Sequence, residues 1–221
     1  MRKTTLLSLA VVLLAVVGGC IVNDELSTVT IQPDGSADWI KFQSNIRSTE
    51  QGSKGAQELK KFVDEFDSHK DSDQIRITEV GGEVREARWV RREVPYANLV
   101  VARFPTATAL ENFFTIKDEK GVVVVQTRFT INGNRRRLSF NVPVPRDQKP
   151  TEKASRSFEE VREQQANGIS ETRLAIASGQ IIASQGFTVA SDKRSALLNP
   201  AKIDELLQTN REQVELFLEW E

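Results

Sequence analysis

The sequence predicts an α+β protein in which a curved antiparallel β-sheet packs against an amphipathic helix and a C-terminal helix. Several stretches alternate apolar and polar residues, as half-buried strands do. Most of them are separated by short turns rich in Gly, Asn and Asp, which favour hairpins. Only two longer segments show the helical spacing of apolar residues. Because crossover helices are few, we expect an antiparallel rather than a parallel sheet.

The first twenty residues have the order of a secretory signal. Arg2 and Lys3 precede an apolar run of twelve residues, Leu6 to Val17, and Gly18-Gly19-Cys20 follows. A positive segment, a short apolar core and a small-residue site define such signals. The run is shorter than the roughly 20 residues that a bilayer-spanning helix needs. We therefore expect residues 1–19 to be removed as a signal peptide.

The segment Val17-Gly18-Gly19-Cys20 resembles the lipobox of bacterial lipoproteins. The resemblance implies cleavage between Gly19 and Cys20, acyl chains such as palmitate on Cys20, and a mature chain of 202 residues out of 221. Cys20 is also the only cysteine, and an unpaired cysteine in a secreted chain calls for such an explanation. Two or three acyl chains, at about 0.8 kcal/mol per buried CH2, would hold the protein on the membrane permanently. The alternatives are a plain cleaved signal followed by a free thiol, or an uncleaved anchor.

Ile21 follows the predicted lipidated cysteine. In many bacteria an Asp at this position accompanies retention in the inner membrane, so the resemblance implies an outer-membrane lipoprotein that faces the periplasm. We expect residues 20–25 to be a short lipidated tether and residues 26–221 to form a single periplasmic domain. Without Arg2 and Lys3 the chain has 28 basic and 31 acidic residues. This balance argues against a nucleic-acid partner and against general attraction to anionic lipid.

The first half of the domain predicts a hairpin, a helix and three further strands. Thr28–Ile31 alternates, Pro33-Asp34-Gly35-Ser36 has turn chemistry, and a second strand follows to Ile46. Ser53–Phe66 has apolar residues at helical spacing, which predicts an amphipathic helix lying on the sheet. A polar loop comes next, and strands are then expected over residues 75–78, 83–92 and 98–104, with a reversal at Gly81-Gly82.

The middle of the chain predicts a second hairpin. Thr106–Phe114 should form a short helical turn capped by Thr106 or Thr108. Val122–Ile131 is the strongest strand, and Asn132-Gly133 favours a tight hairpin turn after it. Pro143 and Pro145 would end the return strand and suggest that it lies at an edge. Residues 146–169 are charged, and we expect either a surface helix or a mobile insertion.

The C-terminal part predicts short strands and then a long helix. Strands are expected over Thr172–Ile176 and Gln180–Ala183 with Ser178-Gly179 as the turn between them, and over Phe187–Val189. Asn199-Pro200 should start a helix that continues to about Trp220. Its apolar face would comprise Ile203, Leu206, Leu207, Val214, Phe217 and Leu218. Its polar face is acidic, so we expect it to dock on the sheet rather than on a membrane.

Two strand-turn-strand segments resemble LppM-like bacterial lipoproteins. They are Thr28–Ala37, shortly after the lipobox, and Leu174–Gly186, where this chain has Ser178-Gly179 in place of the Pro-Gly common in that group. The resemblance implies an envelope domain able to bind an apolar ligand. It transfers no catalytic residue.

The residues that usually carry catalysis are scarce or badly placed. His69 is the only histidine and lies in a charged loop, whereas a catalytic triad needs a buried, oriented histidine. One histidine and an acylated cysteine leave no zinc site. The acidic residues of this region do not follow the EF-hand pattern; they are Asp64, Asp67, Asp71 and Asp73. Nothing singles out a catalytic carboxylate pair, for example among Glu79, Glu83 and Glu86. We therefore predict no catalytic residue, no metal and no cofactor.

Two groups of residues are candidates for binding. Arg135-Arg136-Arg137 follows the second hairpin turn and can contact an anionic ligand such as a lipid headgroup or a glycan phosphate. The same run can instead solvate a strand end and prevent aggregation. Trp39 and Trp89 are either binding aromatics or, as we favour, packing residues.

Together these features predict a membrane-anchored envelope lipoprotein that acts as a non-enzymatic binding or interaction module. Its partners would be the membrane, through lipid on Cys20, and an envelope protein or an apolar ligand. The alternative function is a carrier or sensor of an apolar lipid held in a cavity between sheet and helices. A carboxylate-dependent glycan hydrolase is ranked below both.

Overall fold

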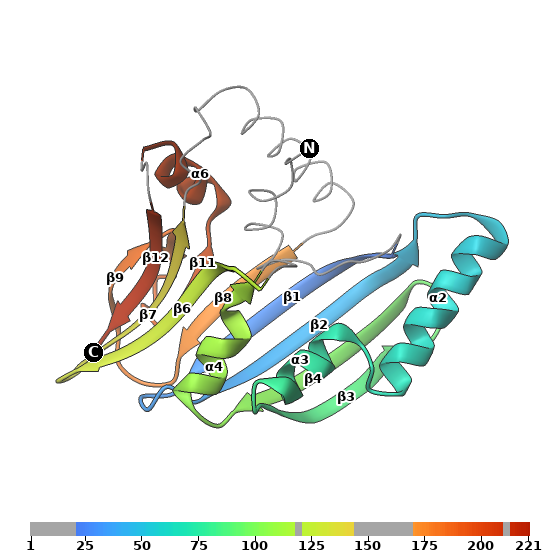
Figure 1. Cartoon of the computed structure of the whole chain (residues 1–221), viewed down its shortest axis with the longest axis horizontal. Coiled ribbons are helices and arrows are strands. Elements are labelled where there is room, and N and C mark those ends of the chain that lie inside the picture. The colour runs from blue at the N-terminus through green and yellow to red at the C-terminus, as the bar shows by residue number, and fades with distance from the viewer. Residues whose placement is uncertain (1–20, 118–120, 144–169, 210–212) are drawn as a thin grey trace.

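The computed structural model describes residues 21–117, 121–143, 170–209 and 213–221. Its strands form two sheets, and helices lie against one side of the larger sheet (Figure 1). The predicted α+β class is confirmed. The strands are nevertheless divided between two sheets, where the sequence predicted one.

The larger sheet has seven strands in the order β10-β11-β8-β1-β2-β4-β3. β1 and β8 pair in parallel and the other neighbours are antiparallel. The first predicted hairpin is confirmed, with Ile31 opposite Ala37. Gly35 in its turn has a φ of +84°, and an added Cβ would lie 2.6 Å from the Cβ of Ala107. The strands are β1 (Ile21–Ile31), β2 (Ala37–Ser48), β3 (Glu83–Arg91), β4 (Tyr96–Phe104), β8 (Ser170–Ile176), β10 (Phe187–Val189) and β11 (Ser195–Leu198).

The smaller sheet has five strands in the order β5-β6-β7-β12-β9. The hairpin predicted at Asn132-Gly133 is confirmed, because it joins β6 to β7 with Asn132 opposite Arg135. The strands are β5 (Ile116–Lys117), β6 (Val123–Asn132), β7 (Arg135–Pro143), β9 (Ile181–Gln185) and β12 (Gln213–Trp220).

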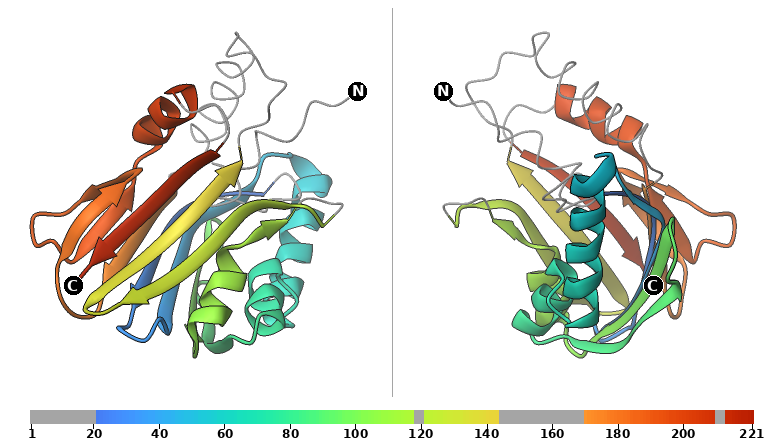
Figure 2. Two further views of the ribbon diagram at one scale, coloured as in Figure 1. Left: turned by 60° about the vertical axis from the view of Figure 1, so that its left-hand side comes forward. Right: turned by 90° about the vertical axis from the view of Figure 1, so that its right-hand side faces the viewer.

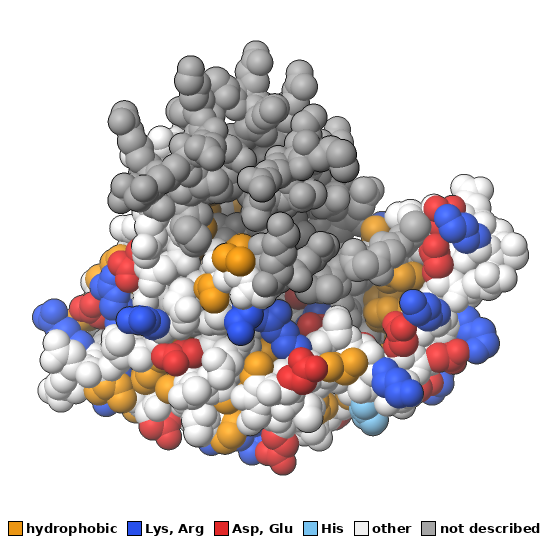
Figure 3. Space-filling view, viewed as in Figure 1, with side chains coloured by type: hydrophobic (Ala, Val, Ile, Leu, Met, Phe, Trp, Pro, Cys, Tyr) orange, Lys and Arg blue, Asp and Glu red, His pale blue; other side chains and the backbone are white. Residues whose placement is uncertain are grey.

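Three of the described helices lie on the same side of the larger sheet (Figure 2). They are α2 (Gly52–Asp67), α3 (Ser72–Glu79) and α4 (Ala107–Phe114), and α6 (Pro200–Thr209) lies beside the smaller sheet. The helix predicted over Ser53–Phe66 is thus confirmed as α2, whose solvent side carries charges of both signs (Figure 3). The helical turn predicted near Thr106 is confirmed as α4, because the Thr106 hydroxyl accepts a hydrogen bond of 3.1 Å from the backbone N–H of Ala109.

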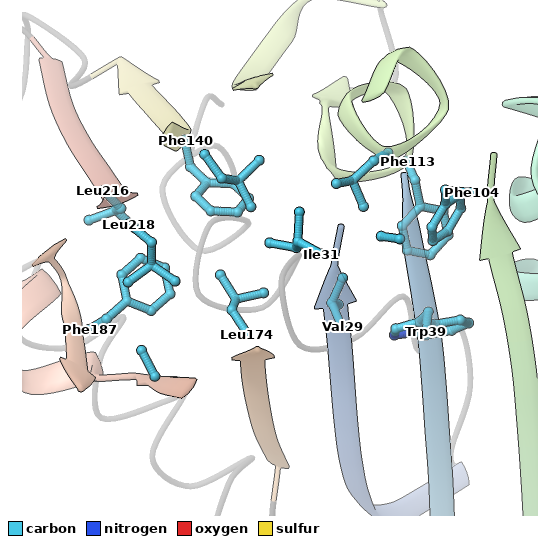
Figure 4. Packing of buried hydrophobic residues seen from close by; sticks show 14 of the residues in the cluster. Val29, Ile31, Trp39, Phe104, Phe113, Phe140, Leu174, Phe187, Leu216 and Leu218 are labelled. Carbon is cyan, nitrogen blue, oxygen red and sulfur yellow. The ribbon is translucent and has the colours of Figure 1, made fainter. Parts of the chain in front are cut away.

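One apolar core joins the two sheets and α4 (Figure 4). The Trp39 ring of β2 lies 5.3 Å from the Phe113 ring of α4, and Phe113 lies 4.7 Å from Phe104 of β4, measured between ring centroids. Phe140 of β7 continues the core toward Phe187 at 6.2 Å. The helices and the smaller sheet therefore cover the same face of the larger sheet. We call this the inner face and its reverse the outer face.

The predicted C-terminal helix is wrong beyond Thr209. α6 begins as expected, because Pro200 is its first residue and the Asn199 side-chain oxygen accepts a hydrogen bond of 3.2 Å from the N–H of Lys202. Residues 213–220 form β12 instead, between β7 and β9. Their buried residues alternate strictly, and they are Val214, Leu216, Leu218 and Trp220. A period of two buries all four against the core, which a helix cannot do.

The strand predicted over residues 75–78 is also wrong, because these residues belong to α3. The Asp71 side chain accepts hydrogen bonds from the N–H groups of Asp73 and Gln74 and so caps the helix. Ile77 is buried while Ile75 is 42% exposed, so the two isoleucines do not share a face as strand alternation requires. Gly81-Gly82 consequently joins a helix to a strand rather than two strands.

Two predicted connections are corrected by the sheet order. β7 ends at Pro143 but lies between β6 and β12, so it is an interior strand rather than an edge. Ser178-Gly179 does not close a hairpin, because β8 and β9 belong to different sheets. A Cβ added at Gly179 would lie 2.0 Å from the backbone oxygen of Glu221, so glycine is needed where the chain crosses between sheets.

The predicted tether is not a free segment. Ile21 is the first residue of β1, opposite Ser48, and Glu25 is paired with Gln43. Strand pairing is thus already present at Ile21, the first residue that the structure describes. The signal peptide (1–19), the lipobox and the charged insertion (146–169) lie outside the described residues.

Candidate functional site

The inner face of the larger sheet changes from apolar to polar along its strands. The pairing register aligns residues of five strands in rows across β3, β4, β2, β1 and β8. One row is apolar: Val84, Ala102, Trp39, Val29 and Leu174. The next is mixed: Ala87, Val100, Lys41, Ser27 and Thr172. The third is mostly polar: Trp89, Asn98, Gln43, Glu25 and Ser170.

Lys41 is the charged centre of this polar end. Its side chain is 9% exposed, and its Nζ lies 2.9 Å from an Oε of Glu25 and 2.5 Å from an Oδ of Asp73. Glu25 belongs to the neighbouring strand β1 and Asp73 to α3, so the ammonium group joins the helix to the sheet. We call Glu25, Lys41, Gln43, Asp73 and Asn98 the inner polar cluster.

The protonation of this cluster follows from burial and pairing. Burial by itself would lower the pKa of Lys41, but the carboxylates of Asp73 and Glu25 outweigh it and hold that pKa above its usual value. Burial raises the pKa of Glu25, and Lys41 offsets only part of this effect. Lys41 therefore stays protonated at neutral pH. A protonated lysine held by two carboxylates is neither a general base nor a nucleophile.

Asn98 of the cluster and its neighbour Ser170 have unsatisfied polar atoms. Asn98 is fully buried, and neither its amide nitrogen nor its amide oxygen has a hydrogen-bond partner in the structure as described. The same holds for the buried hydroxyl oxygen of Ser170, in the same row. An unsatisfied buried polar group costs about 1–3 kcal/mol. These unsatisfied groups therefore lower the free energy of unfolding.

An aromatic group borders the cluster on the side of α2. The Trp89 ring lies 4.7 Å from Phe66, 5.5 Å from Tyr96 and 6.2 Å from Phe62 between centroids. Its indole N–H donates a hydrogen bond of 2.8 Å to Asp67. Trp89 thus fastens α2 to β3 and β4. Trp39 is 4% exposed in the core, so the expectation that both tryptophans serve packing agrees with their positions.

The outer face of the same sheet carries exposed apolar side chains. Leu26 is 48% and Ile40 47% exposed, and Phe42, Leu99 and Val101 are half-buried. The register brings these five residues together across β1, β2 and β4. We call them the outer patch. An apolar patch in the middle of a sheet face is typical of an interaction surface.

The three arginines proposed to bind an anion do not act as one cluster. Arg137 lies 2.8 Å from Glu215 and 3.2 Å from Glu219 between guanidinium nitrogen and carboxylate oxygen, and 3.6 Å above the Phe217 ring. Arg135 also pairs with Glu219, at 3.6 Å. Arg136 donates hydrogen bonds to the backbone oxygens of Pro33 and Asn134. Contact with an anionic ligand remains a prediction.

The acidic residues near His69 have separate structural roles. Asp67 binds Trp89 and Arg92, Asp71 caps α3 and Asp73 pairs with Lys41. Within the described ranges, no group of three His, Cys, Asp or Glu residues is placed to hold a metal ion. Glu83 and Glu86 pair with Arg85 and Arg88 on the exposed strand β3. Asp71 and Asp73 are half-buried in these contacts.

The sequence did not predict the inner polar cluster. The alternation of Trp39, Lys41 and Gln43 with Ile40 and Phe42 is visible in the sequence. Because β2 has apolar side chains on both faces, its sequence does not indicate which face packs against the core. The sequence does contain one indication of the cluster. The turn at Gly35 fixes the register of the hairpin, and this register places the polar residues Glu25 and Gln43 opposite each other.

The predicted lipidation site, Cys20 with cleavage after Gly19, lies outside the described residues and remains a prediction. None of the helices that the structure describes is long and apolar enough to cross a bilayer.

Comparison with known proteins gives one structural likeness. No family model and no curated protein matches the chain. The NMR structure of the folded domain of LppM from Mycobacterium tuberculosis is similar, with a TM-score of 0.42 and 11% identity over 94% of this chain and 92% of that chain. At this similarity the likeness carries no argument about family or function.

Proposed function

We propose that the chain is a bacterial envelope lipoprotein whose α+β domain is a non-enzymatic interaction module held on the periplasmic side of the outer membrane. The observation that carries the proposal is the signal pattern that ends in Val17-Gly18-Gly19-Cys20. The position of the described fold agrees with it, since Ile21–Ile31 form a paired strand of the larger sheet.

The short distance between Cys20 and the sheet limits what the domain can reach. A strand rises about 3.3 Å per residue, so Leu26 lies within roughly 20 Å of the acyl chains along β1. A domain tethered in this way stays beside the bilayer. Its partners would be lipids or proteins at the membrane surface rather than components deep in the periplasm.

An interaction module is preferred over a carrier because of what fills the inner face. Where α4 meets the sheet, aromatic rings of Trp39, Phe104 and Phe113 are in contact. An apolar ligand at this place would have to displace packed side chains. The outer patch, by contrast, is already exposed.

The intact mass of protein extracted from membranes tests the anchor, with Cys20→Ala as the matched variant. We expect the wild-type mass to equal residues 20–221 plus acyl chains, and the variant to keep residues 1–19 and carry no lipid. A wild-type mass without lipid would contradict the proposal.

Native mass spectrometry of the same detergent-extracted protein then separates the module from the carrier. Protein free of bound ligand supports the module. A stoichiometric lipid that remains bound after the detergent is removed would favour the carrier.

A further inference from the structure

The outer patch is framed by four charged residues whose signs alternate. In one row across the sheet, Leu99, Phe42 and Leu26 lie between Arg88 on β3 and Glu171 on β8. In the next row, Val101, Ile40 and Thr28 lie between Glu86 on β3 and Arg173 on β8. Each side of the patch thus has one arginine and one glutamate, in opposite order.

This arrangement is complementary to itself. Rotation of a second copy by 180° about an axis in the plane of the patch, either along β2 or across it, brings each of these two arginines opposite one of the two glutamates. The same rotation places Ile40 and Phe42 against the apolar residues of the other copy. A two-fold interface requires one surface to match itself in this way.

We propose that the outer patch is a homodimer interface, in which the larger sheets of two copies pack face to face with aligned strands. This goes beyond the proposed function and does not depend on lipidation. The apolar residues would supply the affinity, while the four charges at the rim would set the register and exclude other partners. A bilayer surface fits less well, since two arginines and two glutamates give the rim no net attraction to anionic lipid.

The expected dimer is reversible. The five strands span about 19 Å between the outer two, at a spacing of about 4.8 Å. A patch of this width is at the small end of specific interfaces. The four charges already form pairs within the chain, Arg88 with Glu86 at 2.5 Å and Arg173 with Glu171 at 3.5 Å. Exchanging these exposed pairs for pairs between copies contributes little affinity.

Charge reversal at the rim tests the proposal, and a mixture of two oppositely charged variants is the control. One variant, Glu86→Arg with Glu171→Arg, has four arginines around the patch. The other, Arg88→Glu with Arg173→Glu, has four glutamates. Like charges then face each other in either homodimer, so we expect each variant alone to be monomeric at concentrations where the wild type dimerises. An equal mixture should regain dimers as heterodimers, which also shows that both variants are folded.

The measurement is sedimentation of the full chain in density-matched detergent over a series of protein concentrations. Phe42→Asp, at the centre of the patch, should raise the dimer Kd at least about tenfold. Wild-type protein that stays monomeric throughout the series would overturn the proposal and leave the bilayer or another protein as the occupant. It would also be overturned by a dimer that the charge variants do not weaken, or by a mixture that fails to restore it.

Discussion

The two faces of β2 differ in a way that residue type alone would not suggest. On the inner face Lys41 is buried beside Trp39, while on the outer face Ile40 is 47% exposed beside Phe42. A charged residue thus lies inside and an aliphatic one outside on the same strand. The difference shows that burial is decided by what packs on a face. The inner face has carboxylates and helices to receive Lys41, whereas no helix among the described residues lies on the outer face.

The largest difference in stability is expected between alanine substitutions at two adjacent residues of β2, Trp39 and Ile40. Trp39→Ala removes a core ring that contacts Phe113 and the Ser27 hydroxyl. It should lower the free energy of unfolding by about 3–5 kcal/mol. Ile40→Ala should cost less than about 1 kcal/mol, since it changes only a half-exposed position. Urea unfolding at low protein concentration measures both. Equal losses would mean that the outer face is also covered in the monomer.

Breaking the ion pairs of the inner polar cluster should lower the free energy of unfolding by nearly as much as Trp39→Ala. Lys41→Met leaves the largely buried carboxylate of Glu25 and the partly buried carboxylate of Asp73 without their partner, and removal of one member of a buried pair costs up to about 3–5 kcal/mol. Adding Glu25→Gln and Asp73→Asn removes the unpaired charges and should recover most of the loss. The comparison of the single and triple variants by urea unfolding checks this. A single variant as stable as the wild type would show that the cluster is solvated.

The same lysine should contribute to loss of stability at alkaline pH. Because its pKa is raised in the folded state, the unfolded chain releases the proton first, above about pH 10.4. The folded state then binds more protons than the unfolded state, so stability falls as pH rises through this range. Lys41→Met should show a shallower alkaline decline in urea midpoint than the control Lys60→Met, which alters an exposed lysine paired with Asp64. Identical declines would contradict this.

Substitution of Asn98 is expected to raise the free energy of unfolding, by less than the losses predicted for Trp39 and Lys41. The buried amide makes no hydrogen bond in the described structure, so Asn98→Leu replaces an unsatisfied polar group by an apolar one of similar size. We expect a gain of about 1–2 kcal/mol in the free energy of unfolding. The control is Asn141→Leu, since Asn141 accepts a hydrogen bond of 2.6 Å from Gln213. Destabilisation by Asn98→Leu would indicate that the amide is paired in solution.

The smallest effect is expected at the rim of the outer face. Arg173→Ala removes an exposed ion pair with Glu171 and should change the stability of the monomer by less than about 0.5 kcal/mol. Urea unfolding at low protein concentration gives this value. A larger loss would mean that the guanidinium group has a structural role on the sheet as well.

The sequence by itself determined the features that depend on local chemistry. The turns at Gly35 and Asn132-Gly133, the caps at Thr106 and Asn199, and the amphipathic helix α2 were all predicted. Each depends on residues within a few positions of one another, where backbone conformation and hydrogen bonding decide the outcome. The signal pattern ending at Cys20 is local in the same sense, although it lies outside the described residues.

Only the tertiary structure decided which alternating face is covered and which period a segment adopts. Residues 213–220 carry apolar side chains compatible with a helix or a strand, and the free edges of β7 and β9 selected the strand β12. Lys41 became internal because Asp73, which the sequence predicted in a polar loop and the structure places on α3, lies against it. Both outcomes depend on partners distant in the chain. The free energy of those contacts exceeds the small local preferences that sequence patterns report.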